Sequence, residues 1–422
     1  MNAARYFGAD GLCLVALLAG CLTLALATTV LAGSRVIVSA TLNSTLQFFD
    51  SDDFHELQPP LPSRGGGPVR LWVQELDGKP YLFAANHGAV LGSLGVFDLS
   101  GPQATELPLS PFPAGPGSVG VVAGELRIGD SGVPMAFVTN TISAVVAITP
   151  LGCTLPKGSV TGFDLSLLST AGVAQPIGTV DVSSAVPYAV SFDGGDGLAF
   201  VSGNCAGTLD TIEVKETGSV PSDLPVAARF SMTKRTPPRM VGSGPDATLF
   251  AGGRSYTNNI TEGSLTVYDA TSPTPLTTVP LKRADGKSAG PIDANLADTP
   301  GGRHLIVTSN GSDDSVSLID RDVIESCILA VGGPKADCAE AEVLRVPTAV
   351  PGGAPEGIDY DPVTNRIFTV NKTIGSPSLS VIQLSEDGGL SGADIHRIPI
   401  VAIDAAVPVP ALIAFDVVVQ KP

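Results

Sequence analysis

A short apolar string recurs seven times along this chain, and a repeat of this kind limits the folds that the chain can adopt. Each copy places branched or aromatic residues before small or polar ones, and several copies end in Asn. The copies lie at Val36–Ala40, Leu82–Asn86, Ala136–Asn140, Ala199–Ser202, Leu249–Gly252, Leu305–Thr308 and Ile367–Asn371. Their mean spacing is about 55 residues, so each repeat is one supersecondary unit that needs its neighbours to bury its apolar face.

Strand-like segments flank these copies. An alternating segment that often ends in Asp follows a copy across a Gly-, Ser- or Asn-rich turn, as at Leu94–Asp98 and Val316–Asp320. A further segment precedes some copies, as at Gly357–Asp361, and a fourth follows them, as at Ile395–Ile400. Four antiparallel strands per repeat form a blade. The sequence therefore predicts an all-β fold, a seven-bladed β-propeller over residues 33–422.

The two ends of the repeat region predict how the ring closes. The N-terminal repeat begins with its second strand at Val36 and lacks a first strand. The segment Ala411–Asp416 near the C-terminus has the pattern of a first strand and matches Gly357–Asp361. Pairing this C-terminal segment with the N-terminal blade completes seven blades of four strands and removes two open edges, which would otherwise favour aggregation.

At these repeats the chain resembles the YVTN family of β-propeller repeats. The resemblance rests on strands such as Phe137–Asn140 followed by strands such as Val316–Asp320, and it extends from about Ser34 to the end. It implies a ring around a central channel. The wider relatives of that family include surface-layer proteins, lactonases and the heavy chain of methylamine dehydrogenase, so the resemblance does not decide the function.

The N-terminal residues 1–32 predict export. No charged residue occurs from Gly11 to Ala32, and this apolar stretch follows a leader containing Arg5. Cleavage of a signal peptide after Ala27 or Ala32 is the preferred interpretation. Lipid attachment at Cys21 and retention as a membrane anchor are the alternatives, because about 20 apolar residues suffice to cross a bilayer. A periplasmic, cell-surface or extracellular location follows from each of them.

Four cysteines lie outside the export segment, at Cys153, Cys205, Cys327 and Cys338. Four cysteines permit three pairings. Cys327 and Cys338 flank a Gly-Gly-Pro turn and are expected to close a small loop, while Cys153 and Cys205 would join two neighbouring repeats. Such disulfides suit an oxidising compartment.

The charge of the chain excludes nucleic acid as an expected partner. The chain has 41 acidic and 24 basic residues, with a net charge of −17, whereas binding to a phosphate backbone depends on cationic side chains. The 48 glycines and 35 prolines indicate short strands joined by tight turns. Four glycosylation sequons begin at Asn43, Asn259, Asn310 and Asn371, and in a eukaryotic protein they would be exposed in turns.

Residues near the starts of the innermost strands are the candidates for a ligand site at the mouth of the channel. Aligning those strands places Arg70, Tyr188, Arg239, Asp293 and Glu356 near this rim. The segment Pro355–Ile358 also resembles the segment leading into an inner strand of metal-dependent lactonases of the regucalcin type. That resemblance implies a divalent metal such as Ca²⁺ at Glu356, for which Asp293 and Asn295 are further available ligands.

No complete catalytic constellation occurs in the sequence. The four histidines show no ligand spacing, and neither a Gly-x-Ser-x-Gly motif nor a phosphate-binding loop is present. The leading hypothesis is therefore an exported, non-catalytic propeller that presents its channel mouth to a protein partner or a small molecule, with no firmly assigned cofactor. A metal-dependent lactonase-like hydrolase is the first alternative. A subunit of a periplasmic dehydrogenase, which requires a cofactor-bearing partner, is the second.

Overall fold

The fold is taken from a computed structural model of the 422-residue chain. The structure describes residues 34–421 except 89–90, 142–156, 193–196, 205–206, 218–229, 241–244, 252, 270–273, 332, 334, 349, 374–375, 387 and 400–413. The predicted export segment and the predicted Cys153–Cys205 pair therefore lie outside the described residues. Among the described residues, no helix is long and apolar enough to span a membrane.

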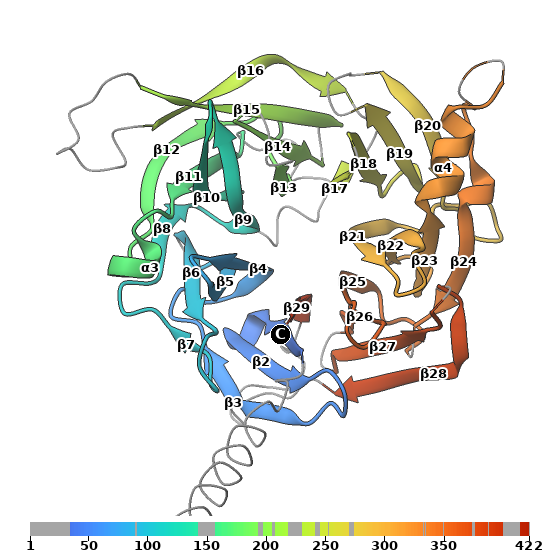
Figure 1. The fold of residues 1–422 in the computed structure, drawn as a ribbon, viewed down its shortest axis with the longest axis horizontal. Helices are drawn as coiled ribbons and strands as arrows, with labels where there is room; N and C mark the ends of the chain where they lie inside the picture. The colour runs from blue at the N-terminus through green and yellow to red at the C-terminus, as the bar shows by residue number, and fades with distance from the viewer. Residues whose placement is uncertain are drawn as a thin grey trace, which may run out of the picture.

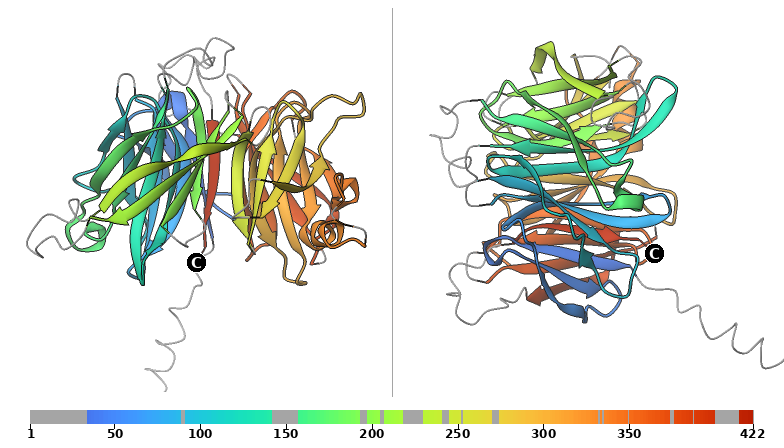
Figure 2. Two further views of the ribbon diagram at one scale, coloured as in Figure 1. Left: turned by 90° about the horizontal axis from the view of Figure 1, so that it is seen from above. Right: turned by 90° about the vertical axis from the view of Figure 1, so that its left-hand side faces the viewer.

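The described chain forms a seven-bladed β-propeller, with seven antiparallel sheets arranged around a central axis (Figure 1). In side view the ring is a disc whose strands run across its thickness (Figure 2). Within each blade the strands are given from the axis outward. The first blade contains β29 (Ala414–Gln420), β1 (Arg35–Ala40), β2 (Thr45–Asp50) and β3 (Glu56–Pro62), and the second contains β4 (Pro68–Leu76), β5 (Lys79–Asn86), β6 (Gly92–Asp98) and β7 (Thr105–Glu106), with β8 (Phe112–Gly115) also paired with β6. The third blade contains β9 (Ser118–Ile128), β10 (Ser131–Asn140), β11 (Ser159–Asp164) and β12 (Gln175–Asp181), and the fourth contains β13 (Pro187–Phe192), β14 (Leu198–Gly203), β15 (Thr208–Glu216) and β16 (Phe230–Met240). The remaining three are β17 (Pro245–Ala251), β18 (Arg254–Asn259), β19 (Ser264–Asp269) and β20 (Pro275–Pro280); β21 (Pro291–Asp298), β22 (His304–Asn310), β23 (Ser315–Asp320) and β24 (Glu342–Pro347); and β25 (Pro355–Asp361), β26 (Arg366–Asn371), β27 (Ser378–Leu384) and β28 (Leu390–Pro399).

The C-terminal strand closes the ring, as the sequence predicts. Strand β29 pairs antiparallel with β1, and Val417 and Val419 lie opposite Val38 and Val36. The strand covers residues 414–420, whereas the prediction placed it at 411–416, of which 411–413 are outside the described residues. Both ends of the propeller thus share one blade.

A buried asparagine at the end of the second strand explains why the repeat often ends in Asn. The Nδ2 group of Asn310 donates to the hydroxyls of Ser315 (3.1 Å) and Ser317 (2.7 Å) on the third strand. Equivalent bonds to hydroxyls of the third strand are made by Asn140, Asn259 and Asn371. Each asparagine therefore ties the second strand to the third beside the turn that joins them, where a buried polar group needs a partner.

This role corrects the expectation of exposure for three of the four sequon asparagines, while the fourth, Asn43 of η1, is half-buried. Asn259, Asn310 and Asn371 have exposed fractions of 0%, because their amide groups bond within the blade. Glycosylation would require each side chain to leave these bonds.

One copy of the repeat was assigned to the wrong strand. Leu249–Ala251 belongs to β17, the innermost strand of the fifth blade, and not to its second strand. The second strand is β18, which ends in Asn259 as β5, β10, β22 and β26 end in Asn. Leu249–Gly252 resembles the repeat because its apolar residues are followed by glycine. Strand β18 consists mainly of polar residues and therefore lacks the apolar pattern of the other second strands.

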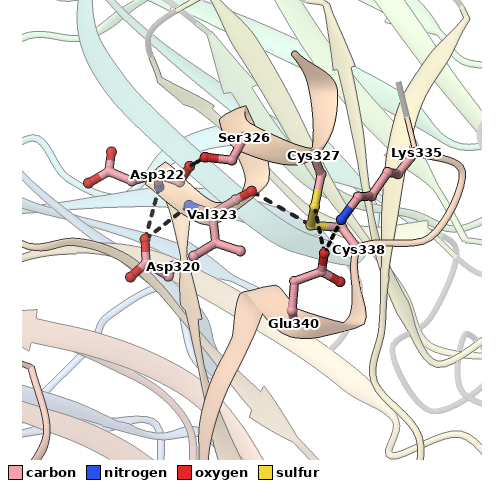
Figure 3. The surroundings of a disulfide bond; sticks show 8 residues. All are labelled: Asp320, Asp322, Val323, Ser326, Cys327, Lys335, Cys338 and Glu340. Carbon is pink, nitrogen blue, oxygen red and sulfur yellow. Dashed lines mark hydrogen bonds and ion pairs between the residues drawn. A yellow bond between two sulfur atoms is a disulfide. The ribbon is translucent and has the colours of Figure 1, made fainter. Parts of the chain in front are cut away.

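A disulfide-closed insertion lies between β23 and β24 and accounts for part of the long repeat (Figure 3). Helix α4 (Arg321–Ile328) begins after Asp320, whose Oδ1 accepts hydrogen bonds from the backbone N–H groups of Asp322 and Val323, a typical N-cap. The disulfide joins Cys327 to Cys338, with their Cα atoms 6.0 Å apart, and confirms the predicted small loop. Short helices η1 (Thr41–Asn43), α3 (Leu168–Ala171) and η4 (Ala339–Ala341) complete the described elements.

Candidate functional site in the central channel

The innermost strands share a local pattern that places selected side chains at the axis. Among the described strands, five of these seven begin with proline: Pro68, Pro187, Pro245, Pro291 and Pro355. Proline is tolerated at the first residue of a strand because its missing N–H is not needed there. In each case the register against the second strand shifts within the next residues. Such β-bulges change the direction of side chains near functional sites.

Three charged residues occupy the same position of three innermost strands. These residues are Arg70 of β4, Asp293 of β21 and Asp416 of β29. The residue that directly follows each of them pairs with the third-from-last residue of the neighbouring second strand. Those pairs are Leu71 with Ala84, Ala294 with Thr308, and Val417 with Val38. The three side chains therefore lie at one level of the channel, although they come from positions more than 100 residues apart in the chain.

An ion-pair network joins these three residues. Arg70 Nη1 lies 2.6 Å from Asp293 Oδ2 and 3.4 Å from Asp416 Oδ1. The guanidinium carbon of Arg70 is 5.2 Å from the centre of the Tyr188 ring, within the range of a cation–π contact. The backbone N–H of Leu71 donates to Asp416 Oδ2 at 2.7 Å. The network thus links the strand that closes the ring to β4, β13 and β21.

A third carboxylate, Asp359 of β25, lies beside this network. Its Oδ1 accepts a 2.6 Å hydrogen bond from Asn295 Nδ2, and its Oδ2 accepts one of 2.6 Å from the backbone N–H of Val419. Asp359 therefore also holds β29 in place. Asp359 and Asp416 were not predicted as site residues.

Burial raises the pKa of all three carboxyl groups. The pKa of Asp359 rises to about 7, mainly because the group is removed from water. The pKa of Asp416 rises to about 8 because burial and the neighbouring Asp293 outweigh the attraction of Arg70. Burial also raises the pKa of Asp293, against the opposing effect of Arg70. The attraction of one guanidinium therefore does not offset the burial of the carboxyl groups around it.

Glu356 also lies on an innermost strand, and Tyr188 connects it to the network. Tyr188 Oη donates to Glu356 Oε1 at 2.7 Å, and Lys372 Nζ lies 2.8 Å from Glu356 Oε2. Asn295 Oδ1 accepts a 2.7 Å bond from the backbone N–H of Leu296. The oxygens of the predicted ligands Glu356 and Asn295, and Oδ2 of Asp293, therefore all have partners within the protein. A divalent metal at these residues stays a prediction.

Two other groups of described residues bring three potential metal ligands together. Cys327, Cys338 and Glu340 form one group, but its two sulfurs are joined in the disulfide. Asp50, Asp53 and His55 form the other on the surface, where the His55 and Asp53 side chains are 57% and 69% exposed. This second group is a possible acidic metal site.

Arg239 does not lie at the rim of the channel. It belongs to β16, the outermost strand of the fourth blade, where it pairs with Leu209 of β15. The prediction placed Arg239 near the start of an innermost strand, whereas it lies near the end of an outermost strand. The other four predicted rim residues, Arg70, Tyr188, Asp293 and Glu356, do lie on innermost strands.

A cavity of about 230 Å³ adjoins the network. Each of the seven innermost strands contributes to its wall. Arg70, Asp293 and Asp416 supply the charged part, and most other lining side chains are apolar, including Trp72 and Phe192. Apolar walls with a few convergent polar groups are typical of small-molecule sites.

Comparisons with known proteins identify the fold and not the family. No family model matches the chain, and no curated protein matches it in sequence. The periplasmic gluconolactonase of Pseudomonas aeruginosa is similar in structure, with a TM-score of 0.60 and 15% identity over 92% of this chain and 99% of that one. A putative 6-phosphogluconolactonase of Bacteroides fragilis has a TM-score of 0.56 and 12% identity over 93% and 99%. A chain of Kuenenia stuttgartiensis hydrazine synthase has a TM-score of 0.54 and 16% identity over 84% and 94%.

Lactonase-like propellers are thus among the similar structures, which supports that part of the predicted resemblance. Membership of the YVTN repeat family stays a prediction.

Proposed function

We propose that this protein is an exported, non-catalytic propeller that binds a small ligand in its axial cavity. The observation that carries the proposal is a cavity walled by all seven innermost strands, with Arg70, Asp293 and Asp416 fixed at one level of it. Polar groups held by regular strands are preorganised for binding, because little motion is left to restrict. The apolar N-terminal stretch 11–32 supports export.

The size of the cavity limits the ligand. Pockets for drug-sized molecules measure about 300 to 1,000 Å³, and this cavity measures about 230 Å³. We therefore expect a ligand smaller than a typical drug. A protein partner would bind at the mouth of the channel and could not fill the cavity itself.

A fragment library tests this proposal. We expect at least one fragment of fewer than about 15 non-hydrogen atoms to raise the melting temperature, because a ligand that binds only the folded state stabilises it. The variant Ala189→Leu adds volume to the wall of the cavity and is expected to abolish this shift. Ala339→Leu makes the same change at an exposed residue and should retain it. Fragments that raise the melting temperature equally in Ala189→Leu and Ala339→Leu, or that do not raise the melting temperature of the unmodified protein, would contradict the proposal.

Lactone hydrolysis is the second candidate function. Two similar propellers are named as a gluconolactonase and a putative 6-phosphogluconolactonase. In addition, an Asp416 carboxyl with a pKa of about 8 stays protonated at neutral pH, as a general acid requires. The metal-dependent version of this candidate relies on Glu356, whose carboxylate is paired with Lys372 in the structure.

We expect the purified protein not to accelerate hydrolysis of glucono-δ-lactone, with or without added Ca²⁺. The measurement is the rate of acid release compared with a protein-free control. Acceleration that the variant Glu356→Gln abolishes, and that a control variant Glu75→Gln retains, would establish the hydrolase instead. A dehydrogenase subunit, the third candidate, requires a cofactor-bearing partner that copurifies with the chain.

A further inference from the structure

We infer that the axial cavity selects a small organic cation, an ammonium group carried on an apolar body. This inference rests on the proposed function and names its class of ligand. It follows from the balance of charge at one end of the cavity and from the apolar surface along the rest of it.

Carboxyl groups outnumber basic groups at the charged end. Arg70 is the basic residue that lines the cavity in the described part of the chain, and two carboxylates, Asp293 and Asp416, line it with Arg70. Asp359 lies behind the wall, attached to the lining residue Asn295 by a 2.6 Å hydrogen bond. Lys372 does not offset these groups because it is paired with Glu356.

The chemistry of this end favours a cation over an anion. An anion would have to compete with Asp293 and Asp416 for Arg70, which already contacts both. A cation instead gains attraction from the carboxylates in a site of low dielectric. Burial, with a contribution from Asp293, raises the pKa of Asp416 to about 8, so the full negative charge of this end develops above about pH 8, and a bound cation would lower this pKa.

The far part of the cavity fits an apolar body. Trp72 follows Arg70 by two residues on β4, and Val418 follows Asp416 by two residues on β29. Because a strand rises about 3.3 Å per residue, these side chains lie about 7 Å further along the channel. Phe192 lines the cavity as well, and aromatic rings attract cations and pack against apolar groups. A ligand with an ammonium head at the carboxylates would place its apolar part here.

Three compounds of one shape and different charge test the inference by isothermal titration calorimetry on the full chain at about pH 8.5, where most Asp416 carboxyl groups are ionised. They are benzylammonium, benzyl alcohol and benzoate. We expect benzylammonium to bind at least about tenfold more tightly than benzyl alcohol, and benzoate to bind most weakly. Asp293→Asn should reduce the affinity for benzylammonium to that for the alcohol, while Asp285→Asn, at a surface loop, should leave it unchanged. Asp416→Asn is the second variant, in case Asp293→Asn does not fold.

The outcomes separate this inference from the proposed function. Tighter binding of benzoate or benzyl alcohol, lost in Ala189→Leu, overturns the cation preference and keeps the axial cavity as a binding site. No binding of the three compounds at up to about 10 mM also overturns the cation preference, and the fragment experiment then decides whether the cavity binds any ligand. Benzylammonium binding that Asp293→Asn and Asp416→Asn leave intact places the cation elsewhere and overturns the inference.

Discussion

Removing residues 414–422 is expected to prevent the chain from folding as a stable monomer. This deletion removes β29, the innermost strand of the first blade, and exposes an edge of β1 facing the channel. Val417 and Val419 are buried in a cluster with Phe368 of the seventh blade, and each buried valine contributes about 1.5 to 3 kcal/mol. Together with the lost strand pairing, the stability lost by the deletion is of the same order as the roughly 5 to 15 kcal/mol that stabilises a typical domain.

Circular dichroism during urea unfolding measures this effect. The full chain should unfold in one cooperative transition, and the deletion variant should show none or aggregate through its open edge. A chain lacking only Lys421 and Pro422 is the matched control, because β29 ends at Gln420, and it should unfold as the full chain does. A deletion variant that keeps the midpoint of the full chain would show that β29 is not required for closure.

The fold was predictable because the features that form a blade recur in most of the repeats. Apolar alternation and an Asn at the end of the second strand mark the blade, and that Asn has a structural task, as the bonds of Asn310 to Ser315 and Ser317 show. The missing first strand at Val36 indicated where the C-terminal segment must pair. The fourth strands carry no repeated pattern, since they form the outer edge and meet fewer neighbours. This is why Arg239 on β16 was misplaced.

The site was predictable only in part, because its network depends on register. Asp416 was read as the end of a strand, since Phe415-Asp416 matches Tyr360-Asp361. In the structure the strand continues to Gln420 and Asp416 lies at the level of Asp293 and Arg70. The apolar run Val417–Val419 was the signal that the strand does not end at Asp416. Side-chain pairings across the channel, such as Arg70 with Asp293, join residues of different blades, and a repeat pattern along the chain carries no information about them.

Raising the pH from about 4 to about 8 is expected to destabilise the protein through the axial carboxyl groups. Burial raises the pKa of Asp359 to about 7 and that of Asp416 to about 8, whereas an unfolded aspartate has a pKa of about 3.9. Between these values the folded state holds protons that the unfolded state has lost, so the free energy of unfolding falls as the pH rises. The contribution of these groups is complete below about pH 4, and it is lost once the pH passes the folded pKa values.

The variant Asp416→Asn separates this effect from the rest of the net charge of −17. Its amide mimics the protonated carboxyl, and its oxygen can still accept the bond from the Leu71 N–H, while Arg70 keeps Asp293 as its partner. At pH 8 we therefore expect the variant to be more stable than the wild type, by on the order of 5 kcal/mol, because each pKa unit between about 3.9 and about 8 corresponds to about 1.4 kcal/mol, and at pH 4 we expect no gain. The matched variant Asp285→Asn, at a surface loop, should follow the wild type at both values. Urea unfolding at a series of pH values measures the difference. If the Asp416→Asn variant and the wild type lose the same stability between pH 4 and pH 8, Asp416 is ionised in the folded protein over this whole range. In that case the attraction of Arg70 outweighs the burial of Asp416, and the closing strand is held by a full ion pair.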